Sequence, residues 1–286
     1  MRSDLLLLLV AAIWGLAFVA QRQGMDHVGP LTFNAVRFVM GAIALIPVVR
    51  WRSRIVPGAA WSVDLRRGVV LGLVLTGGAT LQQWGVVYTT AGKAGFITGL
   101  YVVLVPFLGL FVGQSTHRRT WIGAVLAVVG LYLLTIHDQL VMGLGDGLVL
   151  LGALFWAIHV LLIGRWARHT EPVRLAALQF ATCGVVSGLV GVPLEQPAMG
   201  AVFDAAGPLL YAGLASTGIG YTLQVVAQRS APPAHAAIIL SLEAVFAVIG
   251  GVVMLGETLA ARGLIGCALM LAGMVISQLE PRRRRS

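Results

Sequence analysis

The chain has 286 residues, of which 58% are hydrophobic and only 11% are charged, and its mean hydropathy is +0.90. Soluble domains carry about 25% charged residues, so this composition excludes a soluble globular protein and indicates a membrane protein. A net charge of +9 would point to nucleic acid in a soluble protein, but the basic residues follow the loops of a membrane protein, and we expect no nucleic-acid partner.

Ten apolar segments of roughly membrane-spanning length follow one another along the chain. They cover residues 5–21, 31–49, 68–88, 94–113, 121–136, 147–164, 175–193, 209–228, 234–255 and 259–277. The predicted fold class is therefore an all-α membrane protein with ten transmembrane helices. The first segment resembles a secretory signal but lacks a clear small-x-small cleavage site, and we expect it to remain as the first helix.

The two halves of the chain repeat one another at a nearly constant shift. Trp14 recurs 142 residues later as Trp156, and Pro30 recurs as Pro172. We expect a first five-helix repeat in residues 1–138 and a second in residues 143–286. Because five is an odd number, the second repeat enters the membrane from the opposite side, and inverted repeats are typical of alternating-access transporters.

The basic residues indicate which side of the membrane faces the cytoplasm. Of the 20 Lys and Arg residues, only Arg22, Lys93 and Arg262 lie in loops on the side opposite to the two termini. By the positive-inside rule we expect a multi-pass protein of a bacterial-type inner (plasma) membrane with both termini in the cytoplasm. The basic cluster at residues 282–285 suits anionic lipid of the inner leaflet.

In the first half, polar and aromatic side chains within the spans are candidates for a substrate path. Packing or hydrogen bonding between helices is the alternative for each of them. Pro106 in the fourth span removes a backbone hydrogen bond and predicts a bend there. The candidates are Trp14 in the first span, Thr80, Gln83 and Trp84 in the third, and Thr98 and Tyr101 in the fourth.

In the second half, the eighth span has the most continuous polar face. Thr217, Tyr221, Gln224 and Gln228 are spaced by four, three and four residues, which places them on one side of a helix. For a lone His within a span, a structural hydrogen bond is the alternative to a binding or proton-carrying role. The candidates in this half are Trp156 and His159 in the sixth span, Tyr221 and Gln224 in the eighth, and Ser241 in the ninth.

Two charged residues lie inside the predicted spans, Arg37 in the second and Glu243 in the ninth. A charge alone in the membrane interior costs about 2.5 kcal/mol or more. Arg37 would contact a structural partner or a substrate carboxylate, and Glu243 would titrate, pair or accept hydrogen bonds. Because neither charge is duplicated in the other repeat, we predict that the two form an interdependent pair across the repeats.

The sequence contains none of the patterns expected of a membrane-embedded enzyme or an ATP-driven pump. It has no His-Glu-x-x-His, no Ser/His/Asp arrangement at plausible depth and no Gly-x4-Gly-Lys-Ser/Thr. Cys183 and Cys267 lie within apolar segments and form no spaced framework. We therefore expect no catalytic residue, no metal site and no cofactor, and we predict that the protein is not an enzyme.

Several short motifs occur in order along the chain. They are Trp14-Gly15, Val36-Arg37-Phe38, Pro106, Leu242-Glu243 with Val245-Phe246, and Leu255-Gly256-Glu257. Together with the duplicated helices, this order resembles the EamA-type drug/metabolite transporter superfamily over essentially the whole chain. Where relatives often have Pro after the Leu-Glu pair, this chain has Ala244, which puts a kink at that point in doubt.

The resemblance implies an exporter of small metabolites, because the family includes exporters of amino acids, aromatic ones among them. It also implies a cavity lined by the first four spans of each repeat, with the fifth span of each repeat outside. We predict a secondary transporter that exports amino acids by alternating access, as a monomer or homodimer. A multidrug or lipophilic-cation exporter and a channel-like facilitator are the alternatives, because the sequence names neither the substrate nor a coupling ion.

Overall fold

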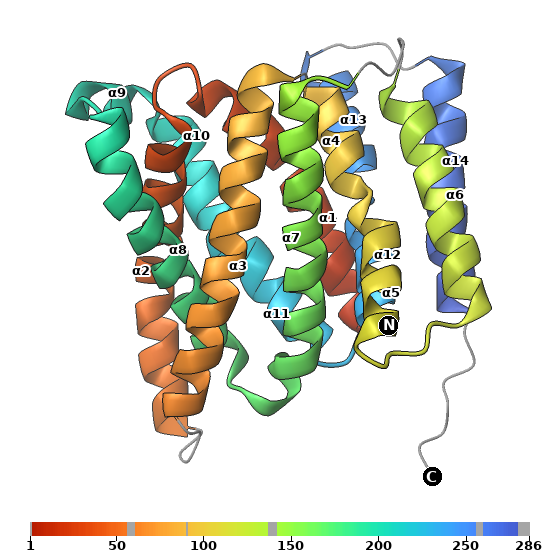
Figure 1. Ribbon diagram of the computed structural model, residues 1–286, viewed down its shortest axis with the longest axis horizontal. Helices are drawn as coiled ribbons and strands as arrows, with labels where there is room; N and C mark the ends of the chain where they lie inside the picture. Colours follow the sequence, from red (N-terminus) through yellow and green to blue (C-terminus); the bar gives the residue numbers. More distant parts are fainter. Residues whose placement is uncertain (1, 56–60, 90, 137–141, 256–259, 280–286) are drawn as a thin grey trace.

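The computed structural model describes residues 2–55, 61–89, 91–136, 142–255 and 260–279. These residues form a bundle of helices and include no β-strand (Figure 1). Within these ranges, seven helical stretches are long and apolar enough to cross a membrane, and Pro233–Ile249 and Ala261–Ser277 are shorter apolar stretches. The predicted all-α class is confirmed. The count of ten spans stays a prediction, and residue 138, the predicted end of the first repeat, lies outside the described residues.

The order of the elements divides at the connection between α6 and α7. The first half comprises α1 (Arg2–Gly24), α2 (Pro30–Ile55), α3 (Trp61–Tyr88), α4 (Ala91–Gly99), α5 (Tyr101–Phe111) and α6 (Arg118–Thr135). The second half comprises α7 (Leu144–Trp166), η1 (Ala167–His169), α8 (Pro172–Glu195), α9 (Met199–Asp204), α10 (Ala206–Leu210), η2 (Tyr211–Tyr221), α11 (Thr222–Gln228), α12 (Pro233–Leu240), α13 (Glu243–Leu255) and α14 (Ala261–Gln278).

Helix starts recur between the halves at the shift seen in the sequence. Helices α1 and α7 begin 142 residues apart, and so do α2 and α8, each of which begins at a proline. Proline suits the first turn of a helix, where its missing N–H has no intrahelical partner. The starts of α12 and α13 follow those of α4 and α5 by the same shift, so that Glu243 occupies the position of Tyr101.

Two helices are longer than their apolar segments. The second and third spans were predicted at residues 31–49 and 68–88, but α2 continues to Ile55 and α3 already begins at Trp61. Helix α2 also passes through Pro47 without ending. Hydropathy measures only the part of a helix that lies in hydrocarbon, and the added turns carry arginines whose heads reach toward water.

The predicted fourth and ninth spans are each interrupted, whereas the sequence predicted a bend only at Pro106 of the fourth and left a kink in the ninth in doubt. One lies at Leu100, between α4 and α5, well before Pro106, and the other lies at Ser241 and Leu242, although this chain has no proline there. At both interruptions a backbone N–H donates to the carbonyl three residues earlier, as in a 3-10 turn. Val103 N donates to Leu100 O at 3.0 Å, and Val245 N donates to Leu242 O at 2.9 Å. Tight turns of this kind keep the backbone satisfied within a membrane.

The predicted eighth span also departs from a plain α-helix. Between α10 and α11 the backbone of Tyr211–Tyr221 is a π-helix, which is rare and widens each turn. The 4-3-4 spacing of Thr217, Tyr221, Gln224 and Gln228 therefore does not give one straight face. Only Tyr221 and Gln224 line the central cavity, while Gln228 donates to Val160 O at 3.0 Å.

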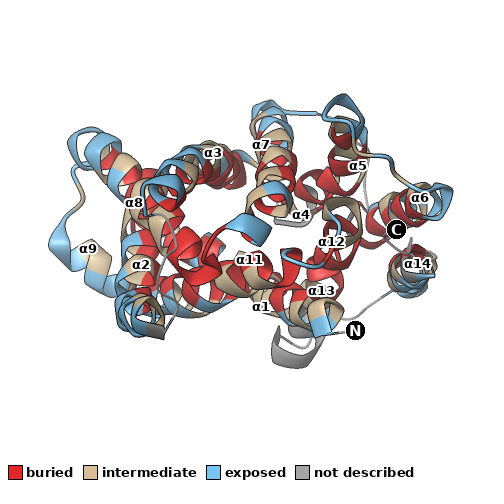
Figure 2. Ribbon diagram, turned by 90° about the horizontal axis from the view of Figure 1, so that it is seen from below, coloured by how far each residue is buried: buried red, intermediate tan, exposed pale blue. Residues whose placement is uncertain are grey.

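Helices α6 and α14 pair at the edge of the bundle, as expected for the fifth span of each repeat (Figure 2). Their contact depends on glycines that face one another reciprocally. A Cβ added at Gly130 would lie 2.4 Å from Gly266 O, and one added at Gly123 would lie 2.6 Å from Gly273 O. Small residues allow this close approach of helix backbones in a membrane.

Helices α2 and α8 run side by side and hold carboxylates at both ends. At one end, Glu195 accepts hydrogen bonds from Leu31 N at 2.9 Å and Thr32 N at 2.8 Å, so that it caps α2. At the other end, Glu171 accepts from Arg174 N at 2.7 Å and caps α8, and it also pairs with Arg52 of α2. Carboxylates at helix N-termini accept hydrogen bonds from free N–H groups and interact favourably with the helix dipole. The two carboxylates therefore hold α2 and α8 together at both ends.

The loops gather on two opposite sides of the bundle. The C-terminal end of α2 and the connections after α5, α7 and α11 lie on the lower side in Figure 1, and the C-terminal end of α3 and the connections after α1 and α8 lie on the upper side. The helix ends and connections of the lower side carry Arg52, Arg54, Arg118, Arg168 and Arg229. The arginines of these helix ends thus gather on one side of the bundle.

Candidate functional site

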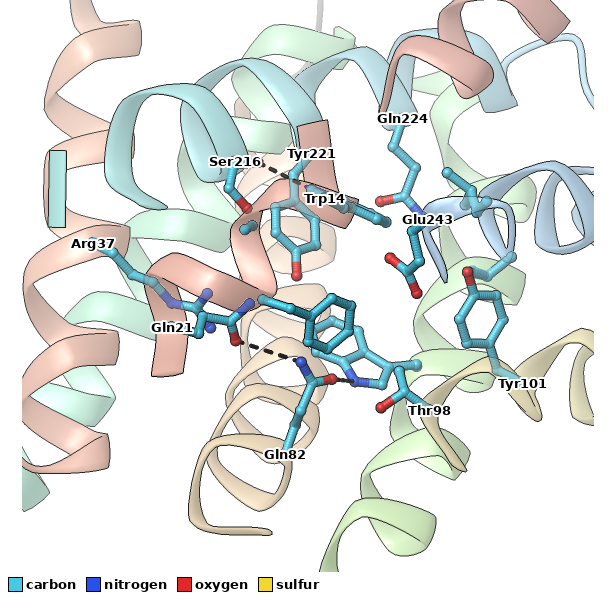
Figure 3. A pocket seen from close by; sticks show the side chains of 15 residues that line it. Trp14, Gln21, Arg37, Gln82, Thr98, Tyr101, Ser216, Tyr221, Gln224 and Glu243 are labelled. Atoms are coloured by element: carbon cyan, nitrogen blue, oxygen red, sulfur yellow. Dashed lines mark hydrogen bonds between the residues drawn. The ribbon is translucent and has the colours of Figure 1, made fainter. Parts of the chain in front are cut away.

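A small cavity lies between elements of the two halves, near the middle of the bundle (Figure 3). Its volume is about 40 Å³, which is room for a few water molecules at most. Sites for drug-sized ligands are about 300–1,000 Å³, so the helices must separate before a metabolite can enter. Its lining comprises Trp14, Ala17, Phe18, Gln21, Arg37, Gln82, Thr98, Tyr101, Trp156, Val160, Ser216, Tyr221, Gln224, Leu240 and Glu243.

Tyr221 is the centre of the aromatic wall of this cavity. Its ring centroid lies 4.6 Å from that of Trp14 and 6.1 Å from that of Trp156, whose plane is inclined by 28° to its own. Phe38, Phe180 and His159 surround the same ring at 6.1–6.2 Å. Such ring pairs add about 0.5–1.5 kcal/mol each beyond burial. The wall that faces the cavity is therefore a preformed apolar surface of Trp14, Tyr221 and Trp156, from α1, η2 and α7, and the other three rings pack behind it.

The indole N–H groups of both tryptophans are already satisfied by the protein. Trp14 Nε1 donates to Ser216 O of the π-helix at 3.2 Å, and Trp156 Nε1 donates to Gln82 Oε1 at 2.7 Å. Gln82 in turn donates to Gln21 Oε1 at 3.5 Å, a long contact. These bonds fix the ring orientations, so the tryptophans offer ring surface rather than hydrogen bonds to a ligand.

Arg37 enters the cavity from α2 as a buried cation, 3% exposed. Its Nε donates to Asn34 Oδ1 at 3.0 Å, and its guanidinium carbon lies 4.6 Å from the centroid of the Phe38 ring. Asn34 and Phe38 are neutral, and no carboxylate of the described residues forms a salt bridge with Arg37. The guanidinium is thus oriented by its own helix while its charge is not balanced.

Glu243 enters the same cavity from the first turn of α13, and it is 6% exposed. A helix N-terminus favours a negative charge, but among the described residues no hydrogen bond or salt bridge reaches this carboxylate. The predicted ion pair with Arg37 is therefore not formed in this conformation. Each side chain faces the cavity from its own helix, and the aromatic wall lies between their helices.

Close backbone contact fixes the position of Glu243. A Cβ added at Gly15 of α1 would lie 2.5 Å from Glu243 O and 2.8 Å from Ala247 N. Gly15 follows Trp14, whose indole packs closely on Gly220. A Cβ added at Gly220 would lie 2.7 Å from Trp14 Nε1. One short stretch of α1 thus positions both an aromatic and the acidic group of the cavity.

Three polar atoms near the acidic side of the cavity have no hydrogen-bond partner among the described residues. They are Thr98 Oγ1 of α4, Tyr101 Oη of α5 and Gln224 Oε1 of α11. Buried polar groups are nearly always paired, and leaving one unpaired costs about 1–3 kcal/mol. An unpaired set that lines a cavity is a reason to expect a ligand there.

The structure brings most of the predicted site residues together at this cavity, but five of them lie elsewhere. Trp84 is 38% exposed and points outward, and Gln83 is fully buried and donates to Gln21 O at 3.4 Å. Thr80 lies on α3 outside the lining, and Ser241 donates to Ile238 O at 2.8 Å at the interruption before α13. His159 lies behind the wall, with Nε2 2.7 Å from Gln179 Oε1. This contact corresponds to the structural hydrogen bond that was the alternative to a binding or proton-carrying role.

Sequence reasoning left three polar lining residues out of the predicted site. Gln21 and Gln82 carry amides within apolar spans, a signal that was visible, and Gln21 shares a helix face with Trp14 and Phe18. Ser216 contributes through its backbone carbonyl, which the π-helix turns toward Trp14. No residue type could reveal that contribution, because it depends on backbone geometry.

A second cavity, with a volume of about 690 Å³, is lined by residues near the helix ends that carry the arginines of the lower side. Its lining comprises Arg52, Val63, Asp64, Arg67, Arg168, His169, Thr170, Glu171, Pro172 and Arg229. A buried ion pair lies beside it, with Arg174 Nη1 3.1 Å from Asp64 Oδ2. The ion pairs tie α2 and α3 of the first half to the start of α8 in the second, and they hold this end of the bundle together.

No cluster of three or more His, Cys, Asp or Glu side chains that could hold a metal ion occurs among the residues that the structure describes. Cys183 and Cys267 are both free thiols. The polar groups of the central cavity are amides, hydroxyls, one guanidinium and one carboxylate, a set suited to binding a small polar molecule.

Comparison with known proteins agrees with this architecture. The EamA-like transporter family matches the chain twice, over residues 1–136 and 143–278. An uncharacterized transporter of Archaeoglobus fulgidus is 32% identical, over 97% of this chain and 86% of its own. A probable amino-acid metabolite efflux pump of Salmonella typhimurium is 25% identical, over 100% of this chain and 97% of its own.

A solved crystal structure superimposes with a TM-score of 0.81, covering 100% of this chain and 99% of the other, at 18% sequence identity. At that identity the likeness concerns the fold alone. The family matches span both halves of the chain, and the resemblance expected from the short motifs is confirmed. The protein is a member of the EamA-like transporter family.

Proposed function

We propose that the protein is a secondary transporter that exports small metabolites, most specifically amino acids including aromatic ones, by alternating access. The observation that carries this proposal is the central cavity, which combines an aromatic wall with amides, hydroxyls and two opposite charges from both halves of the chain. Members of the family are transporters, which points away from an enzyme.

The proposed mechanism depends on two inverted five-helix repeats, residues 1–138 and 143–286. The recurrence of helix starts 142 residues apart supports it, as do the two separate family matches. Helices α2 and α8, which correspond by repeat, pack on one another, and so do α6 and α14. A substrate site between inverted repeats can open to either side when one half rocks against the other.

We propose that the arginine-rich side faces the cytoplasm, with both termini on that side. The helix ends and loops that hold Arg52, Arg118, Arg168 and Arg229 support this orientation. The basic tail at residues 282–285, which we expect to contact anionic lipid, lies outside the described residues. A monomeric or homodimeric state stays a prediction.

The amino-acid class is supported by the chemistry of the cavity and by the Salmonella relative named as a probable amino-acid metabolite efflux pump. Tyr221, Trp14 and Trp156 would contact an apolar side chain, and Gln224 would supply a hydrogen bond. A lipophilic-cation exporter is the second candidate, because a buried carboxylate beside aromatic rings also suits an organic cation. Arg37 in the same cavity disfavours it by charge repulsion.

Counterflow into proteoliposomes tests the proposal. Vesicles preloaded with an unlabelled amino acid should accumulate the labelled one, and the uptake should saturate. A set of amino acids and a lipophilic cation such as tetraphenylphosphonium are compared in parallel. Exchange of the cation alone would identify the multidrug alternative. Flux that neither saturates nor responds to the preloaded solute would identify a channel-like facilitator.

A further inference from the structure

We infer that Arg37 and Glu243 divide the recognition of one zwitterionic ligand, with Arg37 binding its carboxylate and Glu243 binding its ammonium group. The inference deepens the proposed transport function and rests on it. It begins from the finding that both charges line one cavity and that neither forms a salt bridge with the other or with another described residue.

The ion pair that would neutralise both groups without a ligand is absent. In Figure 3, Arg37 and Glu243 approach from opposite sides, and Tyr221 lies between them. A ligand with one charge would balance one residue and leave the other alone in a region where isolated charges are costly. A ligand that carries both charges would balance both at once.

The acidic side of the cavity has the atoms that an ammonium group needs. An ammonium group donates three hydrogen bonds and accepts none. Besides the Glu243 carboxylate, the unpaired oxygens of Thr98, Tyr101 and Gln224 are available as acceptors. These oxygens come from α4, α5, α11 and α13, so a bound ammonium would join elements of both halves.

The basic side of the cavity is suited to a carboxylate. Arg37 is held by its Nε bond to Asn34 and by the Phe38 ring, which leaves the terminal nitrogens of the guanidinium for a ligand. A guanidinium binds a carboxylate through two parallel hydrogen bonds. Bonds between Gln21, Gln82 and Trp156 occupy the neighbouring amides, so Arg37 is the group on this side that can balance an anion.

An α-amino acid is the most compact zwitterion that could bring both charges to the two groups, because its ammonium and carboxylate groups are joined through a single carbon atom. The cavity that both residues line has a volume of only about 40 Å³, which favours a compact ligand. The aromatic wall formed by Trp14, Tyr221 and Trp156 would then receive the side chain as the helices separate.

The experiment is competition against labelled L-phenylalanine counterflow in proteoliposomes that contain the full chain. Phenylalaninamide lacks the carboxylate, and 3-phenylpropionate lacks the ammonium group, while both keep the ring. We expect each to compete about tenfold or more weakly than unlabelled phenylalanine, because each loses one charge-assisted contact. Equal competition by all three compounds in the wild-type protein would overturn the inference, even if no variant could be purified.

Variants of each residue test whether Arg37 binds the carboxylate and Glu243 binds the ammonium group. In Arg37→Met the disadvantage of phenylalaninamide should shrink while that of 3-phenylpropionate persists, and in Glu243→Gln the reverse should hold. Parallel changes for both analogues would overturn the assignment, since a general packing defect has that signature. Arg37→Lys and Glu243→Asp keep the charges and should keep both preferences. Arg22→Met, an exposed residue outside the cavity, is the matched control.

The outcomes distinguish this inference from the proposed function. If amino acids exchange but analogues without one charge compete equally well, transport stands and the zwitterion assignment fails. If no amino acid exchanges and a lipophilic cation does, the proposed function fails and the inference with it. If Glu243→Gln keeps both preferences and loses only a pH dependence of exchange, Glu243 is a proton site and the assignment is wrong. Ligand-induced shifts in Tm of purified protein give an independent measure of binding.

Discussion

Replacing Gly15 by alanine tests whether backbone contact between α1 and α13 positions the cavity. The added Cβ would lie 2.5 Å from Glu243 O, 2.8 Å from Ala247 N and 2.8 Å from Phe246 Cβ, whereas ordinary contacts begin near 3.4 Å. Because the first two are backbone atoms, no rotamer change relieves the overlap. The two helices must move apart by about 1 Å, and Glu243 moves with α13.

The free-energy cost of the overlap at Gly15 can be measured against a matched control. Gly95→Ala places the same Cβ in helix α4, where nothing lies within 4 Å. Both variants gain about 0.5–1 kcal/mol of helix propensity. The difference between their free energies of unfolding therefore measures the cost of overpacking at Gly15, about 1–3 kcal/mol. At about 2–4 °C per kcal/mol, Gly15→Ala should melt several degrees below Gly95→Ala in detergent.

Transport should respond more strongly than stability. A shift of about 1 Å is large for groups that must meet one ligand in fixed geometry, so counterflow per folded Gly15→Ala molecule should fall, while Gly95→Ala exchanges like wild type. Equal Tm and equal exchange for the two variants would refute the close approach of α1 and α13. Lower Tm with unchanged exchange would show that Glu243 does not depend on this contact.

Three further predictions concern other parts of the protein. Gln224→Leu should reduce counterflow without reducing the yield of folded protein, and wild-type exchange would make this amide purely structural. Arg174→Met should lower the free energy of unfolding by about 3–5 kcal/mol, because it removes the ion-pair partner of buried Asp64. Adding Asp64→Asn should recover part of that loss in thermal denaturation. Strictly additive effects of the two substitutions would show that the residues do not stabilise each other. In a background without the native cysteines, Trp51→Cys should react with an impermeant thiol reagent only from the cytoplasm and Phe203→Cys only from outside, and labelling of both from one side would refute the topology.

The candidate site was only partly predictable. Helical spacing correctly grouped Tyr221 with Gln224, because residues three or four apart share a face in most helical forms. Trp84 and His159 were chosen by the same kind of reasoning, yet one points outward and the other lies behind the aromatic wall. Spacing states which residues share a face, and it does not state whether that face meets a cavity, a neighbouring helix or lipid.

The two intramembrane charges show the same limit. Their isolation in the sequence correctly marked Arg37 and Glu243 as unusual, because charges inside a membrane are costly wherever they lie. No salt bridge joins the two residues in this conformation, and their interdependence stays a prediction, since the cost of each charge can be relieved in more than one way. Asn34 and the Phe38 ring surround Arg37, and Gly15 fixes α13, contacts that no sequence pattern specifies.

The sequence by itself determined the membrane class, the helical content and the duplication, because hydrophobicity, backbone satisfaction in hydrocarbon and a shift of 142 residues are properties of local composition and order. Only the tertiary structure decided where helices are interrupted. Leu100 and Leu242 lie at interruptions between helices although neither is followed directly by proline, and Pro47 lies within a helix. The interruptions, the π-helix of Tyr211–Tyr221 and the set of residues around the cavity depend on which helices pack together, and that packing is a property of the whole bundle.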